Sequence, residues 1–419
     1  MEAFQEQFEK AKALRMTGHF PEAISLLNRL ETMLTPEQRF ERTECLNELS
    51  QCLWRKGQPV EAEQQAQTAF ALAKQDPIDL VGQAAALNNL GVVSWRCGEL
   101  NNAMEYFQQS LAIRKELGDR QAIADTLNNL GIMFWRLGRL KQAEEHYKLS
   151  FDIRQEIGNP REIAMSLTNL GVVYWQRGEL AEAEEFLKRS IALKQTIGDP
   201  QTIAESRYQL VQTLLLRNAL KAAATEVEQL SQLHEANELP DITVKYCLAR
   251  GRLKQKTQNY ASALDEFEKA KQLAEEIPDF DLQIDAIRFL VQALLLLYQF
   301  GEQKTHLDLS KALLRELEQL SKDKELHGTY VEALFIRGLL SQATFDLKDA
   351  IDHFQQAEVQ ATELSIHEIA QRAHSELDKL QKQLERVIQL QETSPHAYEQ
   401  VKLQEVMEYL ETIRGWVIS

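Results

Sequence analysis

Three stretches of the chain repeat one pattern: residues 88–107 read NNLGVVSWRCGELNNAMEYF, residues 128–147 read NNLGIMFWRLGRLKQAEEHY, and residues 168–187 read TNLGVVYWQRGELAEAEEFL. A Leu-Gly pair, a tryptophan, a second glycine and an alanine recur in them at a constant spacing of 40 residues. Self-similarity at such a period is typical of solenoids, in which each unit buries its apolar face only against its neighbours. The stretches therefore predict a repeat protein rather than one compact domain.

Each copy is expected to form two helices. In the second copy, a first helix over 123–137 places apolar residues at helical spacing and carries Gly131 in its middle. A glycine inside a helix costs roughly 1 kcal/mol relative to alanine, so three in register indicate that a neighbouring helix approaches closely. Gly138 would end the first helix as a C-cap, and a second helix over 141–157 would present Ala143 to the core.

The order Leu-Gly, aromatic, Gly, Ala, large apolar resembles the tetratricopeptide repeat family. The 40-residue spacing, closed by turns such as Gly118-Asp119 and Gly198-Asp199, is similar to the sub-type found in spindle-orientation scaffolds and kinesin light chains. Weaker copies on both sides extend the resemblance to roughly residues 2–363. The resemblance implies an all-α fold, a right-handed superhelical solenoid of tetratricopeptide-like helical hairpins with C-terminal capping helices.

The regularity of the pattern falls along the chain and predicts three regions. Residues 1–236 hold a regular array of about six repeats, residues 237–363 hold about three divergent repeats, and residues 364–419 form a long helix plus a capping helix. The long helix is expected over 366–391, and Ser394-Pro395 would start the capping helix. In the divergent region the apolar run 290–297, LVQALLLL, is open to two interpretations, an interface or simply core.

The composition disfavours several function classes. The chain of 419 residues has a formal net charge of −16, and an acidic chain repels phosphate backbones, so nucleic-acid binding is not expected. No signal peptide is visible at the N-terminus, and the most apolar run, 291–298, is too short to span a bilayer, so no membrane association is expected. The four cysteines form no CxxC pair, which fits a reduced, cytoplasmic setting.

Catalytic and metal-binding chemistry has little support in the residues. His367 and His374 lie seven residues apart, whereas a helix-borne zinc pair needs a spacing of four. Cys45 and Cys52 are also seven apart on one expected helix, which suits a structural role. No GxGxxG, P-loop or GxSxG motif is present. We therefore expect no enzyme activity, no catalytic residue, no metal and no cofactor.

Candidate binding residues form three ladders across the first helices of repeats two to five. In the family that the sequence resembles, these helices line the concave side of the solenoid, which is the surface that takes ligands. The ladders hold four of the chain's five tryptophans. They are an amide ladder of Asn47, Asn88, Asn128 and Thr168, a tryptophan ladder of Trp54, Trp95, Trp135 and Trp175, and a basic ladder of Arg55, Arg96, Arg136 and Gln176.

These ladders suit a groove for an extended or helical peptide. Asparagine amides can bond a peptide backbone in either direction, arginine attracts carboxylates, and tryptophan offers a large contact area. Related arrays often carry a further asparagine after the Leu-Gly pair, but here Val92, Ile132 and Val172 stand there, so an apolar-acidic peptide or an amphipathic helix is the expected partner. The alternative is structural: tryptophan packs between first helices, arginine lies along the groove, and asparagine bonds between repeats.

The most direct functional prediction is a non-enzymatic scaffold or adaptor that binds a protein or peptide in this groove. One alternative is a regulatory sensor module, whose superhelix changes when a peptide binds. Another is an architectural subunit of a larger complex, for which self-association is possible. Peptide binding is expected in the regular stretch, about residues 44–200, which carries the ladders.

Overall fold

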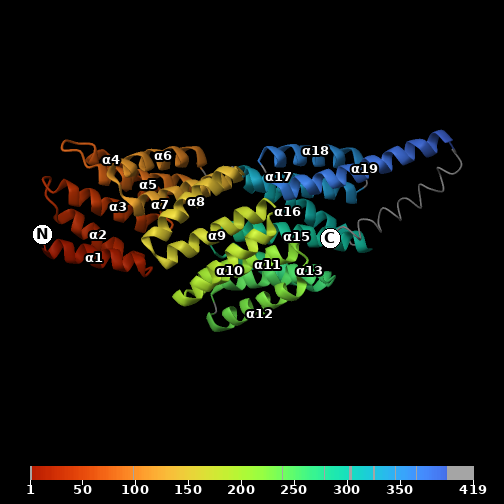
Figure 1. Cartoon of the computed structure of the whole chain (residues 1–419), viewed down its shortest axis with the longest axis horizontal. Coiled ribbons are helices and arrows are strands. Elements are labelled where there is room, and N and C mark those ends of the chain that lie inside the picture. Colours follow the sequence, from red (N-terminus) through yellow and green to blue (C-terminus); the bar gives the residue numbers. More distant parts are fainter. Residues whose placement is uncertain are drawn as a thin grey trace. The chain divides into compact units, whose positions relative to one another are not determined.

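The computed structural model describes residues 2–97, 99–237, 239–277, 279–301, 304–323, 326–344, 346–364 and 366–393. Within these ranges every regular element is a helix (Figure 1). The helices are α1 (Glu2–Met16), α2 (Phe20–Met33), α3 (Arg39–Arg55), α4 (Pro59–Ala73), α5 (Leu80–Cys97), α6 (Leu100–Leu117), α7 (Arg120–Arg136), α8 (Leu140–Ile157), α9 (Pro160–Gln176), α10 (Leu180–Ile197), α11 (Pro200–Leu216), α12 (Leu220–Asn237), α13 (Pro240–Lys256), α14 (Tyr260–Glu275), α15 (Phe280–Gly301), α16 (Lys304–Asp323), α17 (His327–Ala343), α18 (Leu347–Glu363) and α19 (His367–Thr393). The all-α prediction is confirmed.

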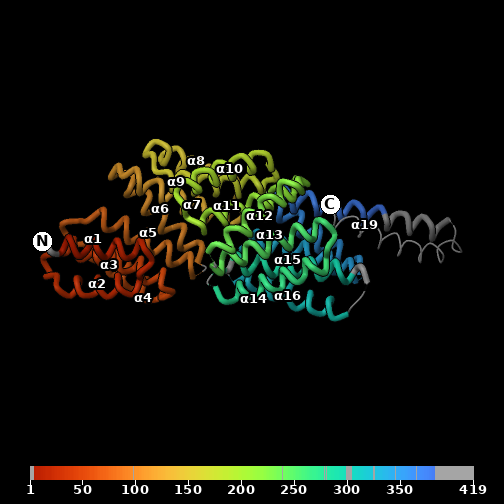
Figure 2. The backbone as a smooth tube through the Cα atoms, turned by 90° about the horizontal axis from the view of Figure 1, so that it is seen from below, coloured from red at the N-terminus to blue at the C-terminus, as the bar shows by residue number. Residues whose placement is uncertain are grey.

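The helices pair in chain order as hairpins. α3 packs on α4, α5 on α6, α9 on α10 and α13 on α14, and the second helix of a hairpin also packs on the first helix of the next, as α4 does on α5. Figure 2 shows this succession along the backbone. Hairpins that bury their apolar faces against their neighbours form the repeat solenoid expected from the 40-residue period.

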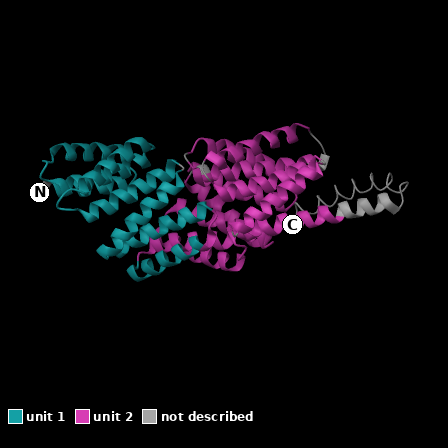
Figure 3. Ribbon diagram, turned by 90° about the horizontal axis from the view of Figure 1, so that it is seen from above, with its two compact units in different colours: residues 1–137, 142–158 teal, residues 138–141, 159–419 magenta. Residues whose placement is uncertain are grey.

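The chain forms two compact units, which Figure 3 colours separately. Unit 1 comprises residues 1–137 and 142–158, and unit 2 comprises residues 138–141 and 159–419. Unit 1 has a core that includes Phe8, Leu27 and Leu49, and unit 2 has a larger core that extends from Leu187 to Ile336. The region boundaries near residues 236 and 363 stay predictions.

Helix ends follow the capping residues. Asp119 accepts a hydrogen bond from the backbone N–H of Ala122 and so caps α7, and the residues that precede α9 and α11 cap those helices in the same way. Gly118 ends α6 in the left-handed conformation. Because the side chain of Asp119 accepts from one free N–H group of the first turn, α7 begins at Arg120, three residues before the start expected from the apolar pattern.

Glycines in the middle of the first helices face large side chains of the second helices. A Cβ on Gly131 would lie 2.6 Å from the ring of Tyr147, and a Cβ on Gly251 would lie 2.5 Å from the ring of Phe267. Both distances are shorter than van der Waals contact, so a side chain at either position would push the helices apart. Gly91 holds the equivalent place in α5. The close approach predicted from these glycines is confirmed.

In several hairpins the turn between the two helices contains a residue with positive φ. Gly138 and Gly178 supply it in the regular hairpins, with φ of +73° and +78°. At the equivalent places in the next two hairpins, Asn218 has φ +57° and Gln258 has φ +64°. These two hairpins keep the left-handed turn after losing the residue that adopts it most easily. Gly98, which holds this place in the third repeat, lies outside the described residues.

The apolar run 290–297 lies in the middle of α15 and belongs to the core. Six of its eight residues are buried, and five of these pack within the core of unit 2. Of the two interpretations that the sequence allowed, the structure supports the core. Beyond the last hairpin, α19 packs on α18 and α17. The capping helix expected from Ser394 lies outside the described residues.

Candidate binding face

Tryptophans and arginines alternate in a stack across the first helices of unit 1. The guanidinium of Arg96 lies 4.7 Å from the ring centre of Trp95 and 5.3 Å from that of Trp54 in the preceding repeat. The guanidinium of Arg136 lies 5.1 Å from Trp135 and 5.9 Å from Trp95. Each of these arginines therefore contacts one ring of its own repeat and one of the previous repeat, at distances typical of cation–π attraction.

The stack is partly open to solvent. Its three tryptophans are half-buried, Arg55 and Arg96 are exposed, and Arg136 is buried. Arg55 lies 5.0 Å from the ring centre of Trp54 at the first end of the stack. Partial desolvation and the positive charges of Arg15 and Arg96 lower the pKa of Arg55. The stack thus offers crowded, accessible positive charge that aromatic rings hold in place.

The amide of Asn47 bonds between repeats. Asn47 is buried, and its side chain donates to the backbone carbonyl of Gly82 in the next repeat at 3.2 Å. Asn89, which is also buried, donates to the backbone carbonyl of Asn47 at 3.0 Å. These bonds join α3 to α5, so the polar atoms have protein partners in the interior.

The next two amides of the ladder also have protein partners. The half-buried Asn88 accepts a hydrogen bond from the side chain of Asn129 at 3.2 Å, which joins α5 to α7. Asn128 is buried and accepts from Arg154 at 3.4 Å. Asn47 and Asn88 thus take part in the inter-repeat bonding that the sequence allowed as an alternative, whereas Asn128 bonds within its own hairpin. Among these amides, Asn88 is the one that stays partly accessible.

The last rung of each ladder lies in unit 2, on α9. Trp175 and Gln176 are half-buried, and Thr168 is buried. The hydroxyl of Thr168 bonds those of Ser190 at 2.8 Å and Ser206 at 2.9 Å. The structure thus places nine of the twelve predicted residues in unit 1 and three in unit 2. The peptide-binding role of all twelve stays a prediction.

A serine pattern with the same 40-residue period fixes the two helices of a hairpin together. Ser110, Ser150 and Ser190 are fully buried, and each donates to a backbone carbonyl of its own first helix at 2.7–2.8 Å. A serine at the same place in three consecutive repeats is visible in the sequence, and its period is the signal that could have found this contact.

Four residues after each of these serines stands a cation. The three cations are Arg114, Arg154 and Lys194. Arg114 donates to the backbone carbonyl of Ala122 at 2.8 Å, and Lys194 donates to the carbonyl of Thr202 at 3.0 Å and to the hydroxyl of Ser206 at 2.7 Å. Burial lowers the pKa of Lys194 to about 8, although the carboxylate of Glu205 opposes the shift. Arg114 and Lys194 thus bond the second helix of one hairpin to the first helix of the next, whereas Arg154 bonds Asn128 and Asp125 on the first helix of its own hairpin.

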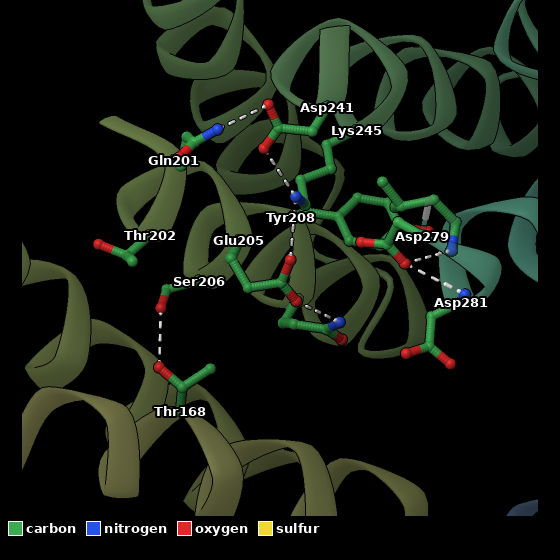
Figure 4. Close-up of polar contacts among 12 residues, drawn as sticks. Thr168, Gln201, Thr202, Glu205, Ser206, Tyr208, Asp241, Lys245, Asp279 and Asp281 are labelled. Carbon is green, nitrogen blue, oxygen red and sulfur yellow. Dashed lines mark hydrogen bonds and ion pairs between the residues drawn. The ribbon is translucent and has the colours of Figure 1, made fainter. Parts of the chain in front are cut away.

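Acidic residues surround Lys245 within unit 2 (Figure 4). The Lys245 Nζ atom lies 3.3 Å from a carboxylate oxygen of Glu205 and 3.4 Å from one of Asp241. Burial opposes the charge of Lys245, but these carboxylates outweigh burial and raise its pKa. Asp279 accepts a hydrogen bond from the backbone N–H of Leu282 at 3.2 Å, and burial raises the pKa of Asp279. The local charge is negative, opposite to that of the arginine stack.

A chain of largely buried polar contacts crosses three first helices of unit 2. The hydroxyl of Tyr208 on α11 donates to Asp285 on α15 at 2.6 Å. Arg288 contacts the other oxygen of Asp285 at 2.6 Å and Glu332 on α17 at 2.8 Å. Burial and the charge of Asp285 raise the pKa of Tyr208. Each charge in this chain has a partner of opposite sign, which is the condition for a buried ion pair to be tolerated.

Comparisons with known proteins identify the repeats. Residues 82–156 and 163–200 match two family models, both described as tetratricopeptide repeat. These hairpins are tetratricopeptide repeats. The resemblance predicted from the Leu-Gly, tryptophan and alanine spacing is therefore confirmed. A search of curated proteins finds no match.

Solved structures share the tetratricopeptide fold along most of the chain. A Rap protein complexed with competence and sporulation factor has a TM-score of 0.58 and 11% identity, and the match covers 92% of this chain and 99% of that one. Aspartyl phosphate phosphatase F from Bacillus subtilis has a TM-score of 0.55 and 9% identity, over 85% of this chain and 93% of that one. At these identities the likeness concerns the fold alone.

The two cysteines considered for chemistry are buried in unit 1. Burial raises the pKa of Cys45 to about 12 and that of Cys52 to about 11, the opposite of what a reactive thiol needs. His374 is exposed and lies 2.8 Å from Glu358. Among the described residues, no group of three or more histidines, cysteines or carboxylates is placed to hold a metal. In the same ranges, no helix combines the length and apolar character needed to cross a membrane.

Proposed function

We propose that the chain is a protein-interaction scaffold that binds an apolar-acidic peptide or an amphipathic helix on the first-helix face of its regular repeats. The observation that carries the proposal is the arginine–tryptophan stack of unit 1. Its exposed arginines supply positive charge, and its half-buried tryptophans supply apolar area. Arginine and tryptophan are also the residues most enriched at the centres of protein interfaces.

The stack favours acidic ligands because it holds its cations in position before binding. A guanidinium that rests on two rings has lost much of its rotational freedom, so a carboxylate can bond it at a smaller entropic cost. The pKa of Arg55, which partial desolvation and neighbouring cations lower, indicates that a bound carboxylate would relieve repulsion among these cations.

Apolar residues flank the stack on the same helices. Val92 and Ile132 are half-buried and stand one turn before Trp95 and Trp135. A ligand that carries acidic and apolar residues on one face would contact both kinds of group, as in helix-in-groove recognition. One solved relative in fold, the Rap protein, is complexed with competence and sporulation factor. That precedent concerns another protein and supports only the use of this fold for binding.

The proposal is tested by selecting twelve-residue peptides from a display library on the full chain. We expect the selected peptides to be rich in aspartate, glutamate and apolar residues. Arg55→Glu combined with Arg96→Glu should weaken their binding by about ten-fold or more, since two charge-assisted bonds become repulsive. Both positions are exposed, so the substitutions should leave the fold intact.

The matched control reverses two charges on second helices of the same unit, through Lys115→Glu and Lys148→Glu, where both side chains are exposed. It should bind the selected peptides with the wild-type affinity. Equal binding by wild type and by the Arg55→Glu/Arg96→Glu variant would rule out the stack as the site.

A further inference from the structure

A groove runs between α12 and α13, and all of its lining residues belong to unit 2. Side chains between Leu220 and Ser231 line it on α12, and side chains between Tyr246 and Thr257 line it on α13. It has a volume of about 500 Å³, and the two helices lie side by side (Figure 2). It follows three turns, about 16 Å, of each helix. We call it the α12–α13 groove.

Two side chains of the α12–α13 groove differ in kind from their counterparts in the preceding repeats. The place of Ser231 carries a large apolar side chain in three preceding repeats, and the place of Arg250 carries leucine in four. These counterparts are Leu111, Phe151 and Ile191 for Ser231, and Leu90, Leu130, Leu170 and Leu210 for Arg250. Because serine is smaller than all three of its counterparts, it leaves room along α12. Arginine brings a charge to a place that is otherwise apolar.

Apolar side chains of both helices line the groove. They include Val227 on α12 and Leu253 and the ring of Tyr246 on α13. Leu220, Tyr246 and Leu253 are half-buried, so part of their apolar surface stays accessible to a ligand. Binding pockets are typically lined in this way, with a few polar side chains among apolar ones. The groove therefore offers surface that apolar side chains of a ligand can cover.

Three contacts hold Arg250 in the groove. Its guanidinium lies 4.7 Å from the ring centre of Tyr246 and donates to the hydroxyl of the same residue at 2.9 Å. It also donates to a carboxylate oxygen of Glu266 on α14 at 2.7 Å. The side chain of Arg250 is still 35% exposed, so a ligand can reach it. A guanidinium that is oriented before binding loses less entropy when it bonds a carboxylate.

The charges at the groove have a positive excess. Arg250 shares the carboxylate of Glu266 with Lys254, whose Nζ atom lies 2.8 Å from it. Burial opposes the charge of Glu266, but its bonds to these two cations outweigh burial and lower its pKa, so Glu266 is an anion at neutral pH. The other charged side chains of the lining are Lys221 and Glu228, which are exposed and of opposite sign. A ligand with one carboxylate would match the remaining positive charge.

We propose that the α12–α13 groove binds the C-terminal residues of a partner protein. The terminal carboxylate bonds Arg250, and the apolar side chain of the last residue covers Leu253. Arg250 and Leu253 stand three residues apart, within one turn of α13. A ligand that uses both must carry a carboxylate and an apolar group close together, and an apolar C-terminal residue carries both on one Cα atom.

The length of the groove fits more than one residue of such a terminus. In an extended chain, side chains on one face repeat at about 6.6 Å. A groove of about 16 Å therefore has room for the last residue and for the one two places before it. The space that Ser231 leaves lies within this length. The inference does not depend on peptide binding in unit 1, because it uses other residues and a different chemical group, a chain terminus.

The test measures the fluorescence anisotropy of a labelled hexapeptide, Ser-Gly-Ser-Leu-Ser-Leu, titrated with the full chain. The peptide is made with a free C-terminal carboxylate and, in a second form, with a C-terminal amide. The wild type should bind the free acid about ten-fold or more tightly than the amide, because the amide loses a charge-assisted bond to Arg250. Replacing both leucines of the peptide with serine should weaken the free acid to a similar extent.

A first variant tests the charge. Arg250→Gln should remove most of the preference for the free acid over the amide. Glu266 keeps Lys254 as its partner in this variant, so the buried carboxylate stays paired.

A second variant fills the groove without changing any charge. It combines Ala224→Met with Ser231→Leu, and α6 carries these two residue types at the same places, Met104 and Leu111. The free acid should bind about ten-fold or more weakly, because the added side chains occupy its place. The melting temperature should be unchanged or higher, since leucine favours a helix more than serine does.

Matched controls change residues outside the groove. Lys269→Gln, exposed on α14, removes one charge, and Ala222→Met with Thr225→Leu, exposed on α12, adds similar bulk. Both should leave the binding of the free acid within about two-fold of wild type. The Arg55→Glu/Arg96→Glu chain should also bind the free acid as the wild type does.

Four outcomes would overturn the proposal. One is the same affinity of the wild type for the acid and the amide, including no detectable binding of either. Another is wild-type binding by the Ala224→Met/Ser231→Leu chain. Loss of binding in the Arg55→Glu/Arg96→Glu chain would assign the peptide to unit 1. Displacement of the label by N-acetyl-leucine as readily as by unlabelled hexapeptide would indicate a site for a free small carboxylate instead of a chain terminus.

Discussion

Units 1 and 2 are built from the same hairpin but treat charge on their first helices differently. In unit 1, arginines lie on tryptophans at the surface, and Arg96 contacts rings of two repeats while staying exposed. In unit 2, Arg288 is largely buried and is matched by carboxylates from two helices. The difference teaches that the hairpin geometry, set by buried glycine and alanine contacts, leaves the polar face of the first helix free to change. Unit 1 leaves Arg96 exposed beside aromatic rings, and unit 2 pairs Arg288 with carboxylates in a largely buried network.

The largest effect that would sharpen this comparison is expected at Arg288. Arg288→Ala leaves the carboxylates of Asp285 and Glu332 largely buried without their partner, and it should lower the free energy of unfolding by about 3–5 kcal/mol. Amide hydrogen exchange in α15 and α17 measures the loss, because these helices should open together.

The matched change in unit 1 is Arg96→Ala. It removes an exposed cation from two rings, and it should cost about 1 kcal/mol or less in the hydrogen exchange of α5. Equal losses of stability in the Arg288→Ala and Arg96→Ala variants would contradict the distinction between buried, paired arginines and exposed ones.

The second effect concerns pH and the cations that join hairpins. The folded pKa of Lys194 is about 8, and an unfolded lysine titrates near 10.4. Between these values the unfolded chain binds more protons than the folded one, so stability rises with pH across this window. The rise should amount to about 2–3 kcal/mol, and urea titrations of wild type and Lys194→Arg at pH 7.5 and about 10.5 measure it.

Lys194→Arg should lack this rise, since arginine stays charged throughout the window. Arg114, the equivalent cation of unit 1, provides the natural comparison, and hydrogen exchange in α6 should show no matching pH dependence. A wild-type stability that falls between pH 8 and 10 relative to Lys194→Arg would contradict the assignment.

The smallest effect should be the same in both units. Gly131→Ala and Gly251→Ala each gain roughly 1 kcal/mol of helix propensity but force a methyl group against Tyr147 or Phe267, which costs about 1–3 kcal/mol. A net loss of about 1 kcal/mol is expected in each, by urea denaturation. Removing the opposing ring, through Tyr147→Ala or Phe267→Ala, should abolish the added cost of the alanine.

The repeat and its internal packing could be predicted from sequence because each depends on short spacings. Gly131 and Tyr147 lie 16 residues apart in one hairpin, and the mid-helix glycine predicted the close approach of a neighbouring helix, although not which side chain it meets. The same holds for the left-handed turn at Gly138. The 40-residue period also located the ladders, since equivalent positions of stacked hairpins fall on one face.

The partners of the polar groups could not be predicted in the same way. The bond from Asn89 to Asn47 crosses 42 residues, and that from Tyr208 to Asp285 crosses 77 and follows no period. Which way a side chain turns at such a place depends on burial and on competing donors, neither of which a spacing contains. The serine and cation pattern around Ser150 repeats every 40 residues, so it could have been found from the sequence.

Asn218 and Gln258 indicate how a repeat array tolerates amino-acid substitutions. Both hold a backbone conformation that disfavours residues other than glycine, so each turn carries a cost of about 1 kcal/mol that its hairpin tolerates. Because most contacts of a hairpin are with its neighbours, such losses stay largely local. Family models match residues 82–156 and 163–200, whereas α11 to α18 keep the same construction with few of the signature residues. Substitutions can thus remove the sequence signature of a repeat while its helical hairpin is kept.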